Sequence, residues 1–153
     1  MNAEKSIVAL NNLIEINSEL IEVYKTATKV TAENDLKDLF SEFEKTSKIF
    51  KSELTEEIQK MGGVPVIRTS RNKMVNALWN ILRSRTIGRD REDILNTLEY
   101  NEFVAVKSYK DTLSANFDYL TSEMHQKLKT QQNLLKEHHD RVKKLGDLML
   151  SYK

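Results

Sequence analysis

The chain has 153 residues, of which 24 are Lys or Arg and 23 are Asp or Glu, so its net charge is only +1. A nearly neutral chain is not a general binder of polyanions. The absence of cysteine excludes disulfide bonds, thiol catalysis and cysteine metal sites. No apolar run approaches the roughly 18 residues that a membrane span requires, and the first residues have no basic-then-apolar signal pattern. We therefore expect one cytoplasmic domain over residues 1–153.

Helix breakers are rare, because the chain has one proline and four glycines. Between them, apolar residues recur at helical spacing. The pattern predicts four long helices at about 3–30, 35–61, 91–114 and 122–150. Gly62 and Gly63 follow the second helix as a glycine C-cap would, and Thr121 is placed to be the N-cap of the fourth.

The connections between these helices define the topology. Short turns at residues 31–34 and 115–120 make each pair of helices an antiparallel hairpin. Residues 62–90 form a long crossover that contains Pro65 and a short amphipathic helix at about 71–85. The sequence thus predicts an all-α four-helix bundle of two hairpins, with the third helix parallel to the second.

Each of the four apolar stripes is interrupted near its middle by a polar residue: Asn17, Ser47, Glu102 and His138. Antiparallel pairing places the first two opposite each other, and the last two within one helical turn of each other. Because a buried carboxylate needs a partner, we predict a mid-bundle polar layer with a hydrogen bond between Glu102 and His138. Such a layer can fix helix register, as a buried Asn does in coiled coils, or it can hold a ligand or a metal ion.

Four segments resemble the ferritin-like superfamily, and within it a bacterial family of four-helix proteins catalogued as a domain of unknown function. They are LNNLIEINSELIEVY, LTEEIQKMGGVP, ILNTLEYNEFVAVKSYKDTL and EHHDRV. The resemblance covers nearly the whole chain and rests on the order and spacing of these segments. It implies a ferritin-like bundle.

The resemblance also implies positions for a di-iron site, which needs one Glu from each of two helices and a Glu-x-x-His pair from each of the other two. At these positions the chain has Asn17, Ser47 and Phe50 in the first hairpin, Glu102 in the third helix, and Leu135 or Lys136 before the helix-four histidine. Two of six ligands remain. We therefore expect no di-iron centre and no cofactor.

A reduced metal site is an alternative. Glu99 and Glu102 stand three residues apart on one helix face, and with His138 or His139 they could hold a single divalent ion. One of the two adjacent histidines must face inward. Asp140 and Arg141 then face outward, where we expect them to dock the crossover or a partner.

The crossover is basic: residues 66–91 contain seven Lys or Arg residues and Asp90 as their one acidic residue. Its candidate partner surface consists of Arg71, Lys73, Trp79, Arg83 and Arg85. This composition can bind nucleic acid or an anionic membrane surface. It can equally cover the bundle or form a dimer interface, and no nucleic-acid motif accompanies it.

No phosphate-binding loop or catalytic triad pattern is present, and the sequence does not favour an enzyme. We predict a metal-free, non-catalytic binding, scaffolding or stress-related protein that forms a homodimer or binds another protein. A residual metal-binding or oxidase function and binding of anionic polymers are the alternatives.

Overall fold

A computed structural model of the chain describes residues 3–66, 90–116 and 118–150. They form four helices, α1 (Ala3–Val30), α2 (Asn34–Lys60), α4 (Asp90–Ala115) and α5 (Ser122–Leu150), and the described ranges contain no strand. The predicted boundaries of all four helices are confirmed to within one residue. The short helix predicted at 71–85 lies outside the described residues.

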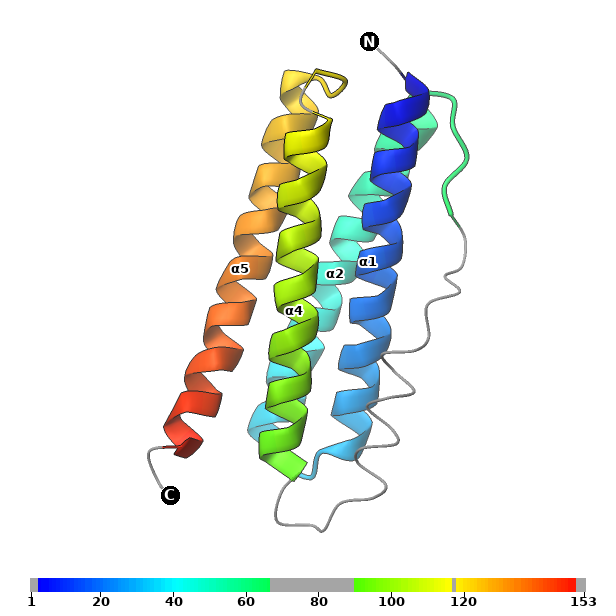
Figure 1. Cartoon of the computed structure of the whole chain (residues 1–153). Coiled ribbons are helices and arrows are strands. Elements are labelled where there is room, and N and C mark those ends of the chain that lie inside the picture. Colours follow the sequence, from blue (N-terminus) through cyan, green and yellow to red (C-terminus); the bar gives the residue numbers. More distant parts are fainter. Residues whose placement is uncertain (1–2, 67–89, 117, 151–153) are drawn as a thin grey trace.

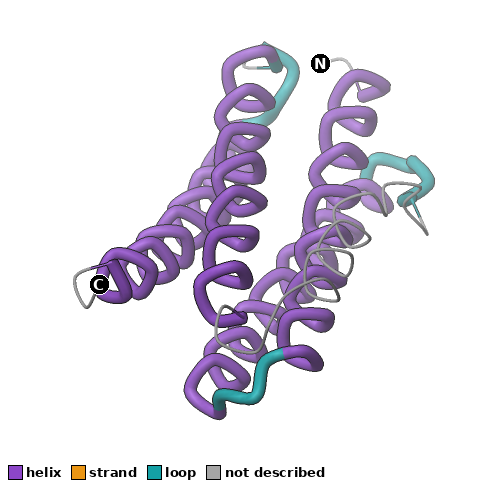
Figure 2. Tube along the Cα trace, turned by 60° about the horizontal axis from the view of Figure 1, so that its bottom comes forward, coloured by secondary structure: helices purple, strands orange, loops and turns teal. Residues whose placement is uncertain are grey.

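The helices form two antiparallel hairpins, α1 with α2 and α4 with α5, and the hairpins meet where α1 packs on α4. Figure 1 shows the α1–α2 turn at the end of the bundle where α4 begins and α5 finishes. Figure 2 turns this end of the bundle toward the viewer. The third long helix therefore runs parallel to the second, as the length of the crossover predicts.

Helices α2 and α5 face each other through long polar side chains rather than through close backbone packing. Three glutamates of α2 accept hydrogen bonds from α5. In order along α2, Glu42 accepts one of 2.6 Å from Arg141 and Glu53 accepts one of 3.0 Å from Gln131. Glu57 accepts one of 2.8 Å from Lys127. The residue numbers of the α5 partners fall as those of the α2 residues rise. The two helices are therefore antiparallel, and polar contacts join them along the surface of this side of the bundle.

Local sequence signals explain the helix ends. Gly62 has a φ of 77°, a conformation that favours glycine, and the Gly63 amide donates to the Ile58 carbonyl at 3.0 Å. These are features of a glycine-terminated helix. At the start of α5, the Thr121 hydroxyl accepts a 3.2 Å hydrogen bond from the Met124 amide, which confirms the predicted N-cap.

Arg91, in the first turn of α4, links the two hairpins at the end of the bundle. Its guanidinium group pairs with Glu33 and Asp35, which lie at the turn between α1 and α2. The hydrogen bond from Arg91 holds the pKa of the Asp35 carboxyl below its ordinary value. A basic residue of the crossover region thus pairs within the chain.

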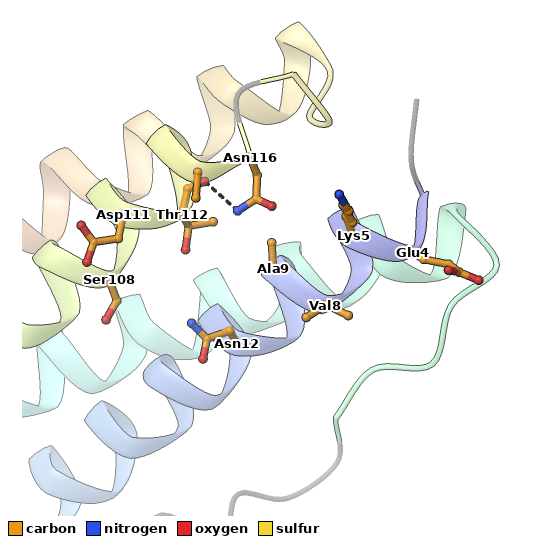
Figure 3. Close-up of a pocket in the computed structure, with 10 residues that line it drawn as sticks. Glu4, Lys5, Val8, Ala9, Asn12, Ser108, Asp111, Thr112 and Asn116 are labelled. Atoms are coloured by element: carbon orange, nitrogen blue, oxygen red, sulfur yellow. Dashed lines mark hydrogen bonds between the residues drawn. The ribbon is translucent and has the colours of Figure 1, made fainter.

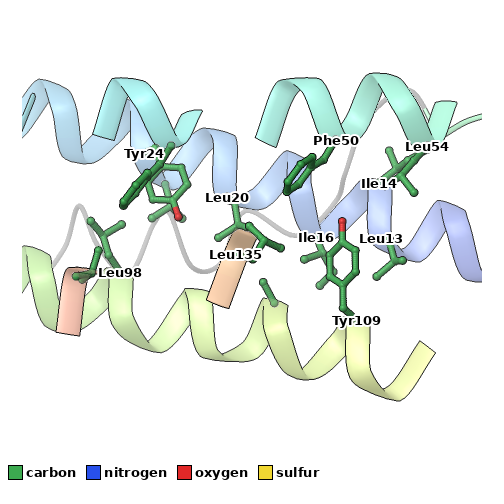
Figure 4. Packing of buried hydrophobic residues seen from close by; sticks show 14 of the residues in the cluster. Leu13, Ile14, Ile16, Leu20, Tyr24, Phe50, Leu54, Leu98, Tyr109 and Leu135 are labelled. Atoms are coloured by element: carbon green, nitrogen blue, oxygen red, sulfur yellow. The ribbon is translucent and has the colours of Figure 1, made fainter. Parts of the chain in front are cut away.

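The core lies along the axis shared by all four helices and follows the predicted stripes. Figure 4 shows Leu20 and Leu135 meeting between the hairpins, and Tyr24 and Tyr109 pointing their hydroxyl groups into the interior. All residues of the α2 stripe from Leu36 to Ile58 are buried, including Ser47. None of the four described helices is long and apolar enough to cross a membrane.

Candidate functional site

The four polar residues predicted to face the interior all do so. Asn17, Ser47 and Glu102 are 0% exposed, and His138 is 4% exposed. Each comes from a different helix, because the apolar stripe of each helix turns this position toward the bundle axis. Polar side chains buried at this depth need partners, and the partners differ from those predicted.

Glu102 is held by Tyr24. The phenol hydroxyl donates a 2.5 Å hydrogen bond to Oε2 of Glu102 across the contact between α1 and α4. Burial raises the pKa of Glu102 to about 8, opposed by this hydrogen bond and reinforced by the nearby charge of Glu99. Burial and the same carboxyl group raise the pKa of Tyr24 well above its ordinary value. At neutral pH both groups therefore keep their protons.

The predicted hydrogen bond between Glu102 and His138 is wrong. Within the described structure, Oε1 of Glu102 and Nδ1 of His138 have no hydrogen-bond partner. The His138 ring instead stacks on Phe43, with ring centroids 3.9 Å apart, and Phe43 contacts Tyr24 edge-on at 5.6 Å. Burial, with the charge of Arg141 as a second cause, lowers the pKa of His138 to about 4, so this ring is neutral.

A second polar chain runs from the interior to the α2–α5 surface. The Asn17 amide donates to the Tyr109 hydroxyl at 2.8 Å, and this hydroxyl donates to Oε1 of Gln131 at 2.6 Å. The Gln131 amide then donates to Glu53 at 3.0 Å. Asn17 also donates to the Leu13 carbonyl, at 2.9 Å. Four residues from four helices are thus joined in series.

The polar layer is therefore two separate hydrogen-bond systems rather than one. Tyr24 with Glu102 is one, and the chain from Asn17 through Tyr109 is the other. In the described part of the chain, one polar atom stays without a hydrogen-bond partner on each of the four predicted residues: Asn17 Oδ1, Ser47 Oγ, Glu102 Oε1 and His138 Nδ1. The carboxyl group and the imidazole, which acid–base or metal chemistry would use, are both enclosed.

Sequence reasoning missed the two tyrosines as polar partners. Tyr24 and Tyr109 occupy apolar-stripe positions, on α1 and α4, and are 0% exposed. A buried tyrosine hydroxyl nearly always finds a hydrogen-bond partner, so each tyrosine in a stripe signals a polar contact opposite it. For Tyr24 this polar contact is Glu102, and for Tyr109 it is Asn17 and Gln131.

The candidate metal ligands are divided between the core and the surface. His138 faces the core, whereas the side chain of His139 is 17% exposed and lies 3.6 Å from the Asp140 carboxylate. Glu99 and His139 line a groove of about 460 Å³ between α4 and α5, which Glu102 does not line. Among the described residues, no group of three or more His, Asp or Glu side chains is placed to hold a metal ion.

The residues predicted to face a partner are only partly described. Arg141 pairs with Glu42 at 2.6 Å and lies over the Phe43 ring at 5.2 Å, so it holds α5 against α2. Asp140 is exposed, as predicted. The remaining residues of this set lie outside the described ranges: Arg71, Lys73, Trp79, Arg83 and Arg85.

Two further grooves open on the surface. One of about 650 Å³ lies between the N-terminal half of α1 and the C-terminal half of α4, where Ala9 points toward Thr112 and Asn116 (Figure 3). The other, of about 450 Å³, lies between α2 and α5 and has Phe50 and Gln131 in its lining. None of the three grooves is lined by Glu102 or His138.

A family model with the description "Domain of unknown function (DUF2383)" matches residues 5–115, which run from the first turn of α1 to the end of α4. The matched span contains Tyr24, Glu102, Asn17 and Tyr109. No curated protein matches the chain.

Proposed function

The chain belongs to the DUF2383 family, and because this description assigns no activity, we propose from the geometry that the protein is a non-catalytic, metal-free bundle. In this proposal its interior holds the helices in register, and its surface binds other molecules as a scaffold does. The observation that carries the proposal is the pairing of the buried Glu102 with the Tyr24 hydroxyl.

The pairing argues against a cation in the core. Within the described ranges of the chain, no group of three or more His, Asp or Glu side chains is placed to hold a metal ion. Metal ions also bind carboxylates in their deprotonated form, which burial of Glu102 disfavours by raising its pKa to about 8. The Tyr24 hydroxyl occupies Oε2 of this carboxyl group, and Oε1 is buried without a hydrogen-bond partner among the described residues. Glu102 is thus suited to accept a hydrogen bond inside the bundle.

Burial also argues against catalysis. A general acid or base must come within hydrogen-bond reach of its substrate. Glu102 is 0% exposed and His138 is 4% exposed, and neither lines one of the three grooves. A polar core that is closed to solvent favours a role in fixing helix register.

The metal content of the protein tests the proposal. We expect the full chain, purified without chelators, to contain iron, manganese and zinc far below one ion per chain. We also expect its melting temperature to be unchanged by these ions, because a ligand that binds the folded state would raise it. Glu102→Gln should have the same low metal content as the wild-type protein, and its melting temperature should also be unchanged by these ions. Glu99→Gln is the matched control.

The residual metal site predicts a different result. Stoichiometric metal that is lost in both Glu102→Ala and Glu99→Ala would replace the proposed function with a mononuclear site at these residues and a helix-four histidine. Binding of DNA or of acidic liposomes by the basic crossover stays a prediction from the sequence. The same holds for a stress-related role in the bacterial cytoplasm.

A further inference from the structure

The exposed face of α4 carries two large aromatic side chains. Tyr100 is 59% exposed and Phe103 is 55% exposed, and the two are three residues apart on the same helix. Residues three, four and seven positions apart share a helix face. On this face Asn96 and Glu99 therefore precede the two aromatic residues, and Lys107 and Lys110 follow them.

The charges on this face are ordered along the helix. Glu99 stands four residues before Phe103 and Lys107 four residues after it, while Asn96 and Lys110 stand seven residues before and after. Lys107 is 64% exposed and pairs within α4 only with the equally exposed Asp111, at 3.4 Å. Before Phe103 the face thus carries Glu99 and Asn96, and after it two lysines, Lys107 and Lys110, with Asp111 beside Lys107.

Such a face is complementary to itself. When two identical helices pack antiparallel about a two-fold axis at Phe103, Glu99 of each copy faces Lys107 of the other, and Asn96 faces Lys110. The same geometry brings the two Phe103 rings together and covers both tyrosines. A two-fold interface requires this self-complementarity, because one patch must bind its own copy.

The groove beside this face gives the second copy a place to pack. It lies between α4 and α5, has a volume of about 460 Å³, and contains Tyr100, Phe103 and His139 in its lining. The Phe103 and His139 rings lie 6.4 Å apart. Aromatic side chains that are surrounded by polar residues are typical anchors of protein interfaces.

We propose that the Asn96–Lys110 face of α4 is a homodimer interface, in which α4 of a second copy packs antiparallel about Phe103. The order of the charges selects a second copy over an unrelated partner, since it matches acid with base at both ends of one symmetric contact. The chain's net charge of +1 leaves little overall repulsion between two copies. This inference rests on the proposed surface role, but its test is independent of the metal content of the core.

Sedimentation equilibrium of the full chain is the first test. We expect a dimer, and we expect Phe103→Asp to raise the dimer dissociation constant at least about tenfold, because it places two carboxylates at the axis. The control is Ile49→Asp, which makes the same kind of change at a 58% exposed apolar residue of α2. It should leave the dissociation constant unchanged. Circular dichroism should show that both variants are folded.

Charge reversal tests the register. Glu99→Lys alone and Lys107→Glu alone each place like charges opposite each other in both halves of the dimer, so each should weaken dimerisation by roughly three- to tenfold. The double variant Glu99→Lys/Lys107→Glu restores opposite charges and should dimerise like the wild-type protein.

Three results would overturn the proposal. They are a wild-type protein that stays monomeric at roughly 100 µM, a dimer that Phe103→Asp does not weaken, and a double charge reversal that is no better than the single ones. A dimer broken by Ile49→Asp but not by Phe103→Asp would place the interface at the α2–α5 groove instead.

Discussion

The Tyr24 hydroxyl and the Glu102 carboxyl group are joined by a 2.5 Å hydrogen bond that crosses from the first hairpin to the second. Glu102 lies on α4 and Tyr24 on α1, so the bond stabilises the contact through which the two hairpins pack. Both residues are 0% exposed. Loss of one partner therefore leaves a polar group that water cannot reach.

We expect Tyr24→Phe to lower the free energy of unfolding by about 1–3 kcal/mol, the cost of leaving a buried polar group without its partner. Glu102→Gln should cost less at pH 7, because the amide keeps the shape of a protonated carboxyl group and still accepts the hydrogen bond. Urea denaturation of both variants and of the double variant measures the coupling. Strictly additive effects would mean that the two side chains do not interact.

The pH dependence of stability should show the titration of Glu102. Its pKa is about 8 in the folded chain, against an ordinary value of 4.5. Between these values the folded state holds a proton that the unfolded state has released, so stability falls as the pH rises. From pH 6.5 to 8 we expect a loss of roughly 2 kcal/mol.

The titration of His138 changes stability in the opposite direction, and it does so at lower pH. Its pKa is about 4 in the folded chain, against an ordinary value of 6.5, so protonation of the unfolded state lowers stability as the pH falls from 6.5 to 4. The two effects offset each other between about pH 4.5 and 6.5, where stability should be nearly level.

Glu102→Gln separates these effects. In this variant stability should rise from pH 4.5 to 6.5, because the effect of the lowered pKa of His138 is no longer offset by Glu102, and then stay level to pH 8. Chemical denaturation at five or six pH values gives both curves. A variant with the same alkaline loss as the wild-type protein would assign that loss to another group.

The helices could be predicted from the sequence because their signals are local. The scarcity of Gly and Pro, the apolar spacing, Gly62 and Thr121 determine the helix boundaries without knowledge of the packing. The same spacing correctly predicts that Asn17, Ser47, Glu102 and His138 are buried, since a residue in the middle of a stripe faces the axis.

The partners of these residues could not be predicted in the same way. The sequence indicates which helices form hairpins, and this led to a pairing of Glu102 with His138 inside the second hairpin. The actual partner, Tyr24, comes from the other hairpin, and Phe43 stacks on the ring of His138. Contacts between hairpins depend on how the hairpins are rotated against each other, which no local signal specifies.

Two buried serines should respond in opposite ways to the same substitution. Ser6 and Ser47 are both 0% exposed. Ser6 donates a 2.9 Å hydrogen bond to the Tyr119 carbonyl, whereas the Ser47 hydroxyl has no hydrogen-bond partner within the described residues.

Ser6→Ala should therefore cost about 0.5–1.5 kcal/mol, and Ser47→Ala should be neutral or stabilising by up to about 1 kcal/mol. The midpoints of urea denaturation give both values. A clear loss of stability in Ser47→Ala would mean that its hydroxyl group has a partner in solution.

Gly63 and Ile7 should be coupled through steric contact. A Cβ atom at Gly63 would lie 2.7 Å from Cδ1 of Ile7, which is closer than packed atoms approach. Because Cδ1 is the movable end of the Ile7 side chain, we expect Gly63→Ala to cost about 0.5–1.5 kcal/mol, the cost of shifting a side chain from its rotamer. Ile7→Val, which removes this Cδ1 atom, should recover part of the loss, so the double variant should be more stable than additivity predicts.

Gly62 provides the matched control. It has open space around its α-carbon but a φ of 77°, so Gly62→Ala should cost about 1 kcal/mol through backbone strain. Ile7→Val should not reduce that cost. Thermal or urea denaturation of the five variants distinguishes the two mechanisms, and equal rescue of both alanine variants would contradict the steric explanation.

The bonds from Tyr24 to Glu102 and from Asn17 to Tyr109 both join α1 to α4, and this has a consequence for the order of folding. Each hairpin is closed by contacts that are near in sequence, and such contacts form fast. Docking of the hairpins requires burial of a carboxyl group and a tyrosine hydroxyl together, so it is the step at which a proton must be in place. The undocked hairpin exposes Glu102, which loses its proton above its ordinary pKa of 4.5. Refolding should therefore slow as the pH rises from about 5 to 8, while helix formation within each hairpin stays fast.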